Sequence, residues 1–231
     1  MRKVVYPYLR HHISGAETRI EVMADSMRVG KTTAVNVIAE GLRQAGHTVT
    51  ESYEDWQNNP YLKEQYRDPS QKLLESQKWF VRRKWEQLRS GGEGMNSTGS
   101  PQVFVQDVPP EMDYNYVVTN WSLGRVGDAE MSIYDSYYRM LEWSVIPAPT
   151  VLVYLTASDE VLLQRAIDSR REFETVEPEY YLMMKKVNRK WLKGVECYPQ
   201  YKIVEVDTDK VDFAHRKRDQ AYLINLVLKN M

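Results

Sequence analysis

Short apolar runs alternate along the chain with longer stretches in which an apolar residue recurs every three or four positions. The short runs predict five strands, at residues 19–24, 47–53, 102–106, 150–155 and 201–206. The longer stretches predict one helix that ends at residue 46 and others at residues 69–89, 112–123, 128–143, 158–170, 178–193 and 216–229. Because strands and helices alternate, we expect an α/β fold whose parallel sheet is covered on both faces.

Two segments fall outside this alternation. Residues 90–101 are rich in glycine and serine and have no apolar period, which indicates a surface loop. Residues 1–18 contain basic side chains but no apolar signal-peptide core, so we interpret them as an N-terminal arm. Residues 19–231 then form one domain, of a size that allows a substantial core.

Composition and charge narrow the range of functions. The chain has 31 Lys and Arg against 32 Asp and Glu, a formal net charge of -1, so its charge does not indicate nucleic acid as a partner. No apolar run is long enough to predict a membrane span. The single cysteine, Cys197, excludes an internal disulfide and is typical of a reducing compartment, which favours the cytoplasm.

The segment Val29-Gly30-Lys31-Thr32-Thr33, between the first strand and its helix, has the sequence of a phosphate-binding loop. Such a loop needs backbone N–H groups at a helix N-terminus, a lysine beside the phosphates and a hydroxyl that holds Mg²⁺. Lys31 and Thr32 can supply the last two. The residues predicted to bind the nucleotide here are Ser26, Met27, Arg28, Val29, Gly30, Lys31, Thr32 and Thr33.

This loop departs from the pattern G-x-x-x-x-G-K-[ST], which has glycine where this chain has Asp25. Arg28 also occupies a position that is often small. Two interpretations stay open: Arg28 offsets the charge of Asp25, or the loop has lost tight nucleotide binding.

Further polar motifs follow the predicted strands, at the sheet edge where ligands bind in such folds. Glu54-Asp55-Trp56 follows the second strand, and Gln106-Asp107 ends the third. Between them lie Gln65-Tyr66-Arg67 and a long helix that carries Gln77. This order resembles that of the deoxynucleoside kinase family, from Arg19 to Phe213. The resemblance implies a three-layer P-loop NTPase fold with a five-stranded parallel sheet and an Arg-rich lid.

The resemblance implies roles for several of these residues. Glu54 matches the general base that takes the proton of the nucleoside 5′-hydroxyl. Tyr66 matches the residue that holds the sugar 3′-hydroxyl, and Gln77, eleven residues on, matches the glutamine that pairs with the base. Asp107 matches the acid that helps Thr32 to organise Mg²⁺. The plain alternatives are a solvated loop acid for Glu54 and a polar helix surface position for Gln77.

The match is mixed after Asp107. The family has Asp-Arg-Ser or Glu-Arg-Ser there, whereas this chain has Asp107-Val108-Pro109. Valine cannot replace a guanidinium, so either another cation such as Arg82 or Arg83 reaches the site or phosphoryl transfer is impaired. Asp113 matches a position that faces the base, although a charged residue in the first turn of a helix is the alternative.

The predicted lid follows the fourth strand. Arg165 and Arg171 align with family arginines that embrace the transferring phosphate, and arginine suits that task because its planar donors follow charge spread over several oxygens. Arg170 stands where glycine is usual. Glu174 matches the lid glutamate that binds the 3′-hydroxyl, and Asp207 belongs to the loop that matches the adenine side of the ATP site.

The predicted function is Mg²⁺-dependent transfer of the γ-phosphoryl of ATP to the 5′-hydroxyl of a deoxynucleoside. An ionised Asp113 only accepts hydrogen bonds, which favours adenine, cytosine or guanine over thymine. One alternative is a nucleoside monophosphate kinase, for which Arg82, Arg83 and Lys84 are the candidate cations for a second phosphate. The others are a noncatalytic relative and a kinase that acts on nucleic acid. The family resemblance also implies a homodimer, with the aromatic-rich helix at residues 128–143 either as part of the core or as the dimer surface.

Overall fold

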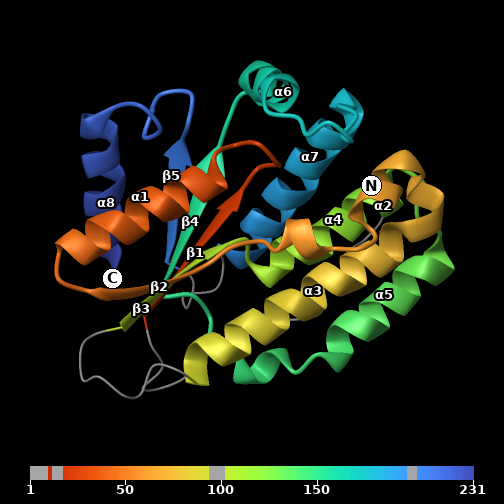
Figure 1. Ribbon diagram of the computed structural model, residues 1–231, viewed down its shortest axis with the longest axis horizontal. Coiled ribbons are helices and arrows are strands. Elements are labelled where there is room, and N and C mark those ends of the chain that lie inside the picture. The colour runs from red at the N-terminus through yellow and green to blue at the C-terminus, as the bar shows by residue number, and fades with distance from the viewer. Residues whose placement is uncertain (1–9, 12–17, 94–101, 197–201) are drawn as a thin grey trace.

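The computed structural model describes residues 10–11, 18–93, 102–196 and 202–231. Its centre is a parallel sheet with the strand order β2-β3-β1-β4-β5 (Figure 1). The strands are β1 (Thr18–Ala24), β2 (Thr48–Ser52), β3 (Gln102–Asp107), β4 (Val151–Thr156) and β5 (Ile203–Asp207). All five predicted strands are present, and the predicted α/β class with a five-stranded parallel sheet is confirmed.

Helices cover both faces of the sheet. They are α1 (Lys31–Gln44), α2 (Leu62–Arg67), α3 (Pro69–Glu93), α4 (Pro110–Ser122), α5 (Asp128–Met140), α6 (Asp159–Asp168), α7 (Pro178–Val195) and α8 (Lys217–Asn230). Figure 1 shows α1 and α8 side by side on one face, whereas α3, α4, α5 and α7 cover the other. Short 3-10 turns occur at Trp56–Asn58 and Trp143–Val145. The short helix α2 was not predicted.

The sheet has an apolar core on each face, because successive side chains along β1 point to opposite faces. Ile20 and Val22 point to the α1 and α8 side, where they join one apolar cluster. Met23 points to the other side and packs in the cluster that includes Met112 of α4 and Trp191 of α7. The central strands β1, β3 and β4 are therefore buried on both faces, as is typical of a parallel sheet.

Arg10 is part of this interior although it lies within the predicted arm. Its side chain is 2% exposed, and its guanidinium contacts Glu21 of β1 at 2.5 Å and Glu111 of α4 at 2.9 Å. Burial raises the pKa of Glu111, and the charge of Arg10 partly offsets that rise. The guanidinium thereby ties the first turn of α4 to the central strand.

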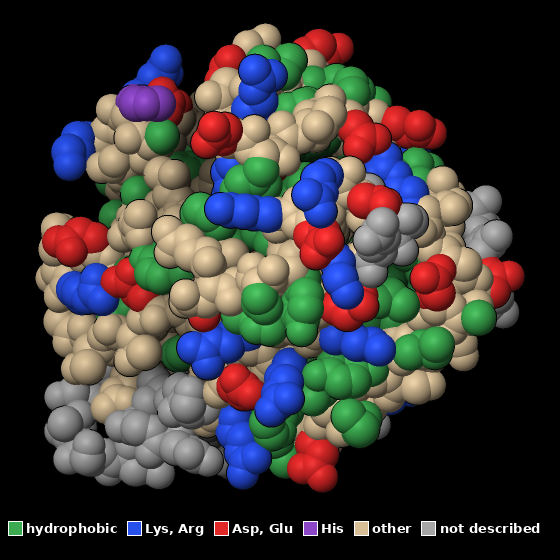
Figure 2. Space-filling model, turned by 45° about the vertical axis from the view of Figure 1, so that its right-hand side comes forward, with side chains coloured by type: hydrophobic (Ala, Val, Ile, Leu, Met, Phe, Trp, Pro, Cys, Tyr) green, Lys and Arg blue, Asp and Glu red, His purple; other side chains and the backbone are tan. Residues whose placement is uncertain are grey.

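Some predictions concern residues outside the described part of the chain. They are most of the arm (residues 1–9 and 12–17), residues 94–101 of the predicted surface loop, and Cys197. None of the helices in the described ranges is long and apolar enough to cross a membrane. On the face in Figure 2, basic and acidic side chains are interspersed.

Candidate active site

Strand β1 leads into the predicted phosphate loop, which turns into α1 at Gly30. Gly30 has a φ of 106°, in the left-handed region that glycine adopts without strain. Because glycine has no side chain to cap the helix, the N–H groups of the first turn of α1 are left for an anion. Lys31 and Thr32 are the first two helical residues, so both side chains start beside these N–H groups.

The Asp25 carboxylate is fully buried beneath this loop, and its partners come from β4 and α7. It accepts a hydrogen bond from the Tyr154 hydroxyl at 3.1 Å and contacts Nε of Arg189 at 2.5 Å. Burial raises its pKa, and the charge of Arg189 partly offsets the rise. The interpretation that Arg28 offsets the Asp25 charge is therefore wrong, because Arg189 does so and Arg28 pairs with Glu174.

We expect Asp25→Gly to destabilise the protein without improving ATP binding. The substitution leaves the partly exposed Arg189 without this carboxylate, which costs about 1–3 kcal/mol. Thermal unfolding and the KM for ATP test this expectation. Glu160→Gln, an exposed change at the start of α6, is the control and should alter neither quantity. A glycine variant with a much lower KM for ATP would instead support a loop that has lost tight binding.

Thr32 and Asp107 meet beyond the end of β1. The Thr32 hydroxyl donates to Oδ2 of Asp107 at 2.5 Å, and Oδ1 of Asp107 is buried with no hydrogen-bond partner among the described residues. One hydroxyl and one carboxylate fit Mg²⁺, which is held by few protein oxygens together with phosphate oxygens. Over the described ranges, no group of three or more His, Cys, Asp or Glu side chains forms a larger metal site.

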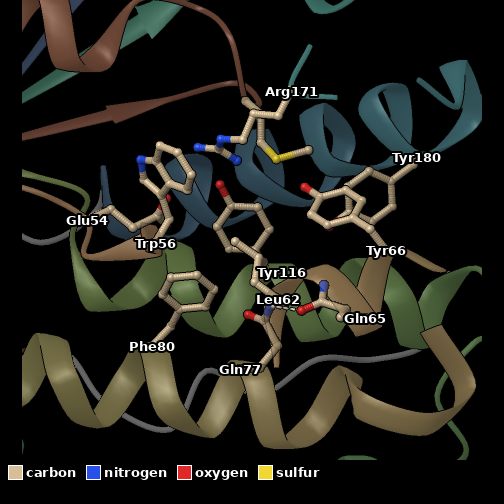
Figure 3. A pocket seen from close by; sticks show the side chains of 11 residues that line it. Glu54, Trp56, Leu62, Gln65, Tyr66, Gln77, Phe80, Tyr116, Arg171 and Tyr180 are labelled. Carbon is tan, nitrogen blue, oxygen red and sulfur yellow. Dashed lines mark hydrogen bonds between the residues drawn. The ribbon is translucent and has the colours of Figure 1, made fainter. Parts of the chain in front are cut away.

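A cavity lies beside this loop and brings several predicted residues together. Gln77 and Phe80 enter it from α3, Arg171 from the segment between α6 and α7, and Tyr116 from α4 (Figure 3). The lining residues are Met27, Glu54, Trp56, Leu62, Gln65, Tyr66, Gln77, Phe80, Tyr116, Arg171 and Tyr180. Five predicted site residues from five separate segments, Met27, Glu54, Tyr66, Gln77 and Arg171, therefore share one cavity.

Glu54 is the acid in this cavity. Burial raises its pKa, the charge of Lys84 lowers it and that of Asp107 raises it again. Lys31 and Arg171 also lower the pKa. A carboxylate with a raised pKa accepts a proton more readily than a solvated one, so Glu54 has the environment of a base rather than that of a solvated loop acid.

Gln77 is a buried part of the wall and Tyr66 a half-buried one. Gln77 is 4% exposed, so it is not on the helix surface, and its side-chain oxygen has no hydrogen-bond partner among the described residues. Its side chain points into the cavity, where an amide both donates and accepts (Figure 3). The Tyr66 ring packs edge-on against Phe173 of the segment before α7, with the ring centroids 5.6 Å apart.

Arg83 is not in this cavity. It lies on the exposed side of α3 and pairs with Asp55 at 3.1 Å and with Glu86 at 3.3 Å. Arg82 pairs with Glu86 on the same side. Neither arginine is among the residues that line the nucleoside cavity, so the substrate contact of Arg83 stays a prediction.

Lys84 is the cation that reaches the site instead. It is 2% exposed, and its ammonium donates to the backbone oxygen of Asp107 at 3.0 Å. It also exerts the largest charge effect on both Glu54 and Asp113. The signal in the sequence was the helical spacing: Lys84 is seven residues after Gln77, which puts both on one face of α3.

Asp113 lies in the first turn of α4 and is 1% exposed. Neither of its carboxylate oxygens has a hydrogen-bond partner among the described residues, so it does not cap the helix. Burial raises its pKa well above the usual range, while Lys84 lowers it and Glu54 raises it. Asp113 does not line the cavity itself, but it precedes Tyr116, which does, by one helical turn.

We expect Asp113→Asn to stabilise the protein, by more at high pH than at low pH. The folded-state pKa of Asp113 is raised, so its contribution to stability is present below the unfolded value of about 3.9 and is lost as the pH rises towards the folded pKa. At pH 7.5 the variant should have a Tm about 2–5 °C above that of the original protein. Calorimetry at pH 4.5, 6 and 7.5 measures the difference, and a lower Tm at pH 7.5 would contradict the expectation.

The two predicted lid arginines lie in different places. Arg171 belongs to the lid segment, residues 169–177 between α6 and α7, whereas Arg165 belongs to α6. Arg171 lines the cavity, with its guanidinium 3.8 Å from the centre of the Trp56 ring, and it bonds to Glu174 at 2.5 Å. Arg165 lies in α6 and donates to the Thr208 hydroxyl at 2.7 Å and to the Thr208 backbone oxygen at 3.0 Å. It is thus tied to the loop after β5, next to Asp207, and is not among the residues that line the nucleoside cavity.

One family model and several known proteins are similar to this chain. A family model described as deoxynucleoside kinase matches residues 23–231. A probable deoxycytidine kinase of Fowlpox virus is 23% identical over 197 residues, which cover 83% of this chain and 80% of the viral protein.

Solved structures of a deoxyadenosine kinase from M. mycoides have the same fold. One, with the products dCMP and dCDP, has a TM-score of 0.71 at 19% identity, and the match covers 93% of this chain and all of that one. Another, with bound dATP, has a TM-score of 0.71 at 18% identity and covers 92% and 98% of the two chains. Because the family model spans most of the sequence, the chain belongs to the deoxynucleoside kinase family.

Proposed function

We propose that this member of the family transfers the γ-phosphoryl group of ATP to the 5′-hydroxyl of a deoxynucleoside, with Glu54 as the base. The observation that carries the proposal is the cavity in which Glu54, Tyr66, Gln77 and Arg171 meet beside the phosphate loop. The 5′-oxygen forms a bond to the γ-phosphorus while the bond from that phosphorus to the bridging oxygen breaks. The bridging oxygen leaves with ADP, and Glu54 takes the hydroxyl proton.

The chain's own residues divide the remaining tasks. The first turn of α1 and Lys31 bind the phosphates, and Thr32 with Asp107 would hold Mg²⁺. Mg²⁺ supplies charge neutralisation at the phosphate oxygens when it is bound. Lys84 keeps a positive charge near Glu54, which favours the ionised form that accepts a proton. Arg165 and Asp207, on the β5 side, are proposed to contact the nucleotide.

Gln77 and Asp113 support a preference for cytosine, adenine or guanine. The Gln77 amide reads the edge of a base, and the ionised form of Asp113 only accepts hydrogen bonds, which favours a base with an amino group that thymine lacks. The relatives point the same way, since they are a probable deoxycytidine kinase and a deoxyadenosine kinase. Glu174 and Tyr66 are proposed to hold the 3′-hydroxyl.

We also propose that the protein is a homodimer that works in the cytoplasm. Tyr134 and Tyr138 of α5 are buried, so this part of the aromatic-rich helix belongs to the core. The opposite side of α5 leaves Ile133 54% and Met140 68% exposed, and we propose that the second subunit covers these two side chains. Light scattering of the purified protein measures the oligomeric state.

The proposed reaction is tested with ATP labelled at the γ-phosphate, Mg²⁺, the four deoxynucleosides and their 5′-monophosphates, with product identity as the readout. We expect a labelled monophosphate from deoxycytidine, deoxyadenosine or deoxyguanosine. Labelled diphosphate alone would favour the monophosphate kinase, and no labelled product would favour the noncatalytic relative. Thymidine as the best substrate would contradict the base preference. Of the three cations considered for a second phosphate, Arg82 and Arg83 pair with acids on the exposed side of α3, whereas Lys84 is buried beside Asp107.

A further inference from the structure

Arg28 has an unusual backbone conformation for a long side chain. Its φ is 63°, in the left-handed region that favours glycine, and it lies in the phosphate loop three residues before Lys31. Within the described ranges it is the one residue other than glycine with a positive φ. Residues with such a strained backbone are often found at functional sites, which suggests that the contacts of the Arg28 side chain serve the site.

The Arg28 guanidinium reaches across the site to the lid segment. It pairs with one oxygen of Glu174, which is 146 residues away in the sequence, and Arg171 bonds to the other oxygen. The Glu174 side chain is 1% exposed, whereas those of Arg28 and Arg171 are 20% and 23% exposed. Two guanidiniums therefore converge on a single carboxylate, which leaves one positive charge in excess.

This pair of arginines stands between the two reactants of the proposed reaction. Arg171 lines the cavity that contains Glu54, and Met27, the neighbour of Arg28, lines it too. On the other side, Arg28 belongs to the loop that ends at Lys31. A phosphoryl group that moves from the loop to the cavity passes this position, and its three oxygens match the planar donors of arginine better than one carboxylate does.

We propose that Arg28 is a catalytic residue, which contacts the transferring phosphoryl group together with Arg171 and takes the place of the guanidinium that the chain lacks at Val108. Glu174 holds the two arginines in position before the phosphoryl group arrives. The inference rests on the proposed function. Arg28, a residue of the phosphate loop, would then supply positive charge to the phosphate oxygens as the bond to ADP breaks.

The first test compares Arg28→Ala with Arg125→Ala. Arg125 is a matched control because it also pairs with the lid segment, through Glu177, and is 24% exposed. We expect kcat to fall on the order of 100-fold or more in the Arg28 variant, with the KM for the nucleoside nearly unchanged. Arg125→Ala should keep kcat within about 3-fold. An unchanged kcat in Arg28→Ala, or an equal loss in both variants, would overturn the proposal.

The second test measures binding of a transition-state mimic. Nucleoside, ADP, Mg²⁺ and aluminium fluoride together imitate the phosphoryl group in transit, and calorimetry gives the affinity. Arg28→Ala should bind this mimic about 100-fold less tightly than the original protein and bind ADP alone equally well. Equal affinity for the mimic would overturn the proposal. Failure of the proposed function gives another result: the original protein makes no labelled monophosphate and does not bind the mimic, which overturns both.

Discussion

Replacing Lys31 by alanine is expected to abolish phosphoryl transfer, with kcat lower by about 1,000-fold or more. Lys31 is the first residue of α1 and only partly buried, so its charge acts on the phosphates and its side chain contributes little to the core. Turnover of labelled ATP with the best deoxynucleoside measures the loss. Thermal unfolding should show a Tm within about 2 °C of that of the original protein.

Lys217→Ala is the matched control for this substitution. Lys217 is the first residue of α8, as Lys31 is of α1, but it is exposed and is not one of the predicted site residues. The control should retain full turnover. Equal activity of the Lys31 and control variants would remove the assignment of residues 25–32 as the phosphate loop.

Glu54→Gln is expected to reduce kcat by about 100-fold to 1,000-fold and to leave the KM for the nucleoside nearly unchanged. The amide keeps the shape of the side chain but cannot take the 5′-hydroxyl proton, so the loss falls on the transition state. Steady-state kinetics separate the two parameters. A variant that loses affinity but not kcat would make Glu54 a binding residue instead of the base.

The pH dependence of kcat gives a second view of Glu54. Because burial raises its pKa and the base acts in the ionised form, kcat should rise with pH through a pKa above that of free glutamate, about 4.3. Lys84 lowers this pKa, so Lys84→Met should move the rise to higher pH. The other charged groups that act on Glu54 are Asp107, Lys31, Arg171 and Asp113. Lys78→Met, also in α3 but near Tyr137, is the control; the same pH profile in all three proteins would contradict this role of Lys84.

The fold and much of the cavity were predictable because the signals are local. Buried strands read as apolar runs, and Gly30, Lys31 and Thr32 mark the start of α1 within three residues. Glu54 and Asp107 could be placed together because both follow parallel strands, whose ends share one edge of the sheet. These inferences need no knowledge of how distant side chains pack.

The missed features depend on contacts between distant parts of the chain. The partner of Asp25 is Arg189, 164 residues away, and no local pattern links the two. The choice between Arg83 and Lys84 depends on which side of α3 faces the cavity, and one residue shifts a helical position by about 100°. Glu174 was predicted as a substrate contact, but its pairing with Arg28 required the fold to bring the lid segment to the loop.

The position of Arg10 has a consequence for how the chain can be shortened or synthesised. Its guanidinium lies 11 residues before Glu21 and 101 residues before Glu111, between two buried carboxylates. During synthesis Arg10 leaves the ribosome before Glu21 and Glu111, so the cation is already present when α4 folds and the two acids become buried. A chain that started after this residue would leave the carboxylates of Glu21 and Glu111 buried without their cation, which would destabilise the fold. Helix α4 would then be most stable at low pH, because burial raises the pKa of Glu111 and Arg10 would no longer offset that rise.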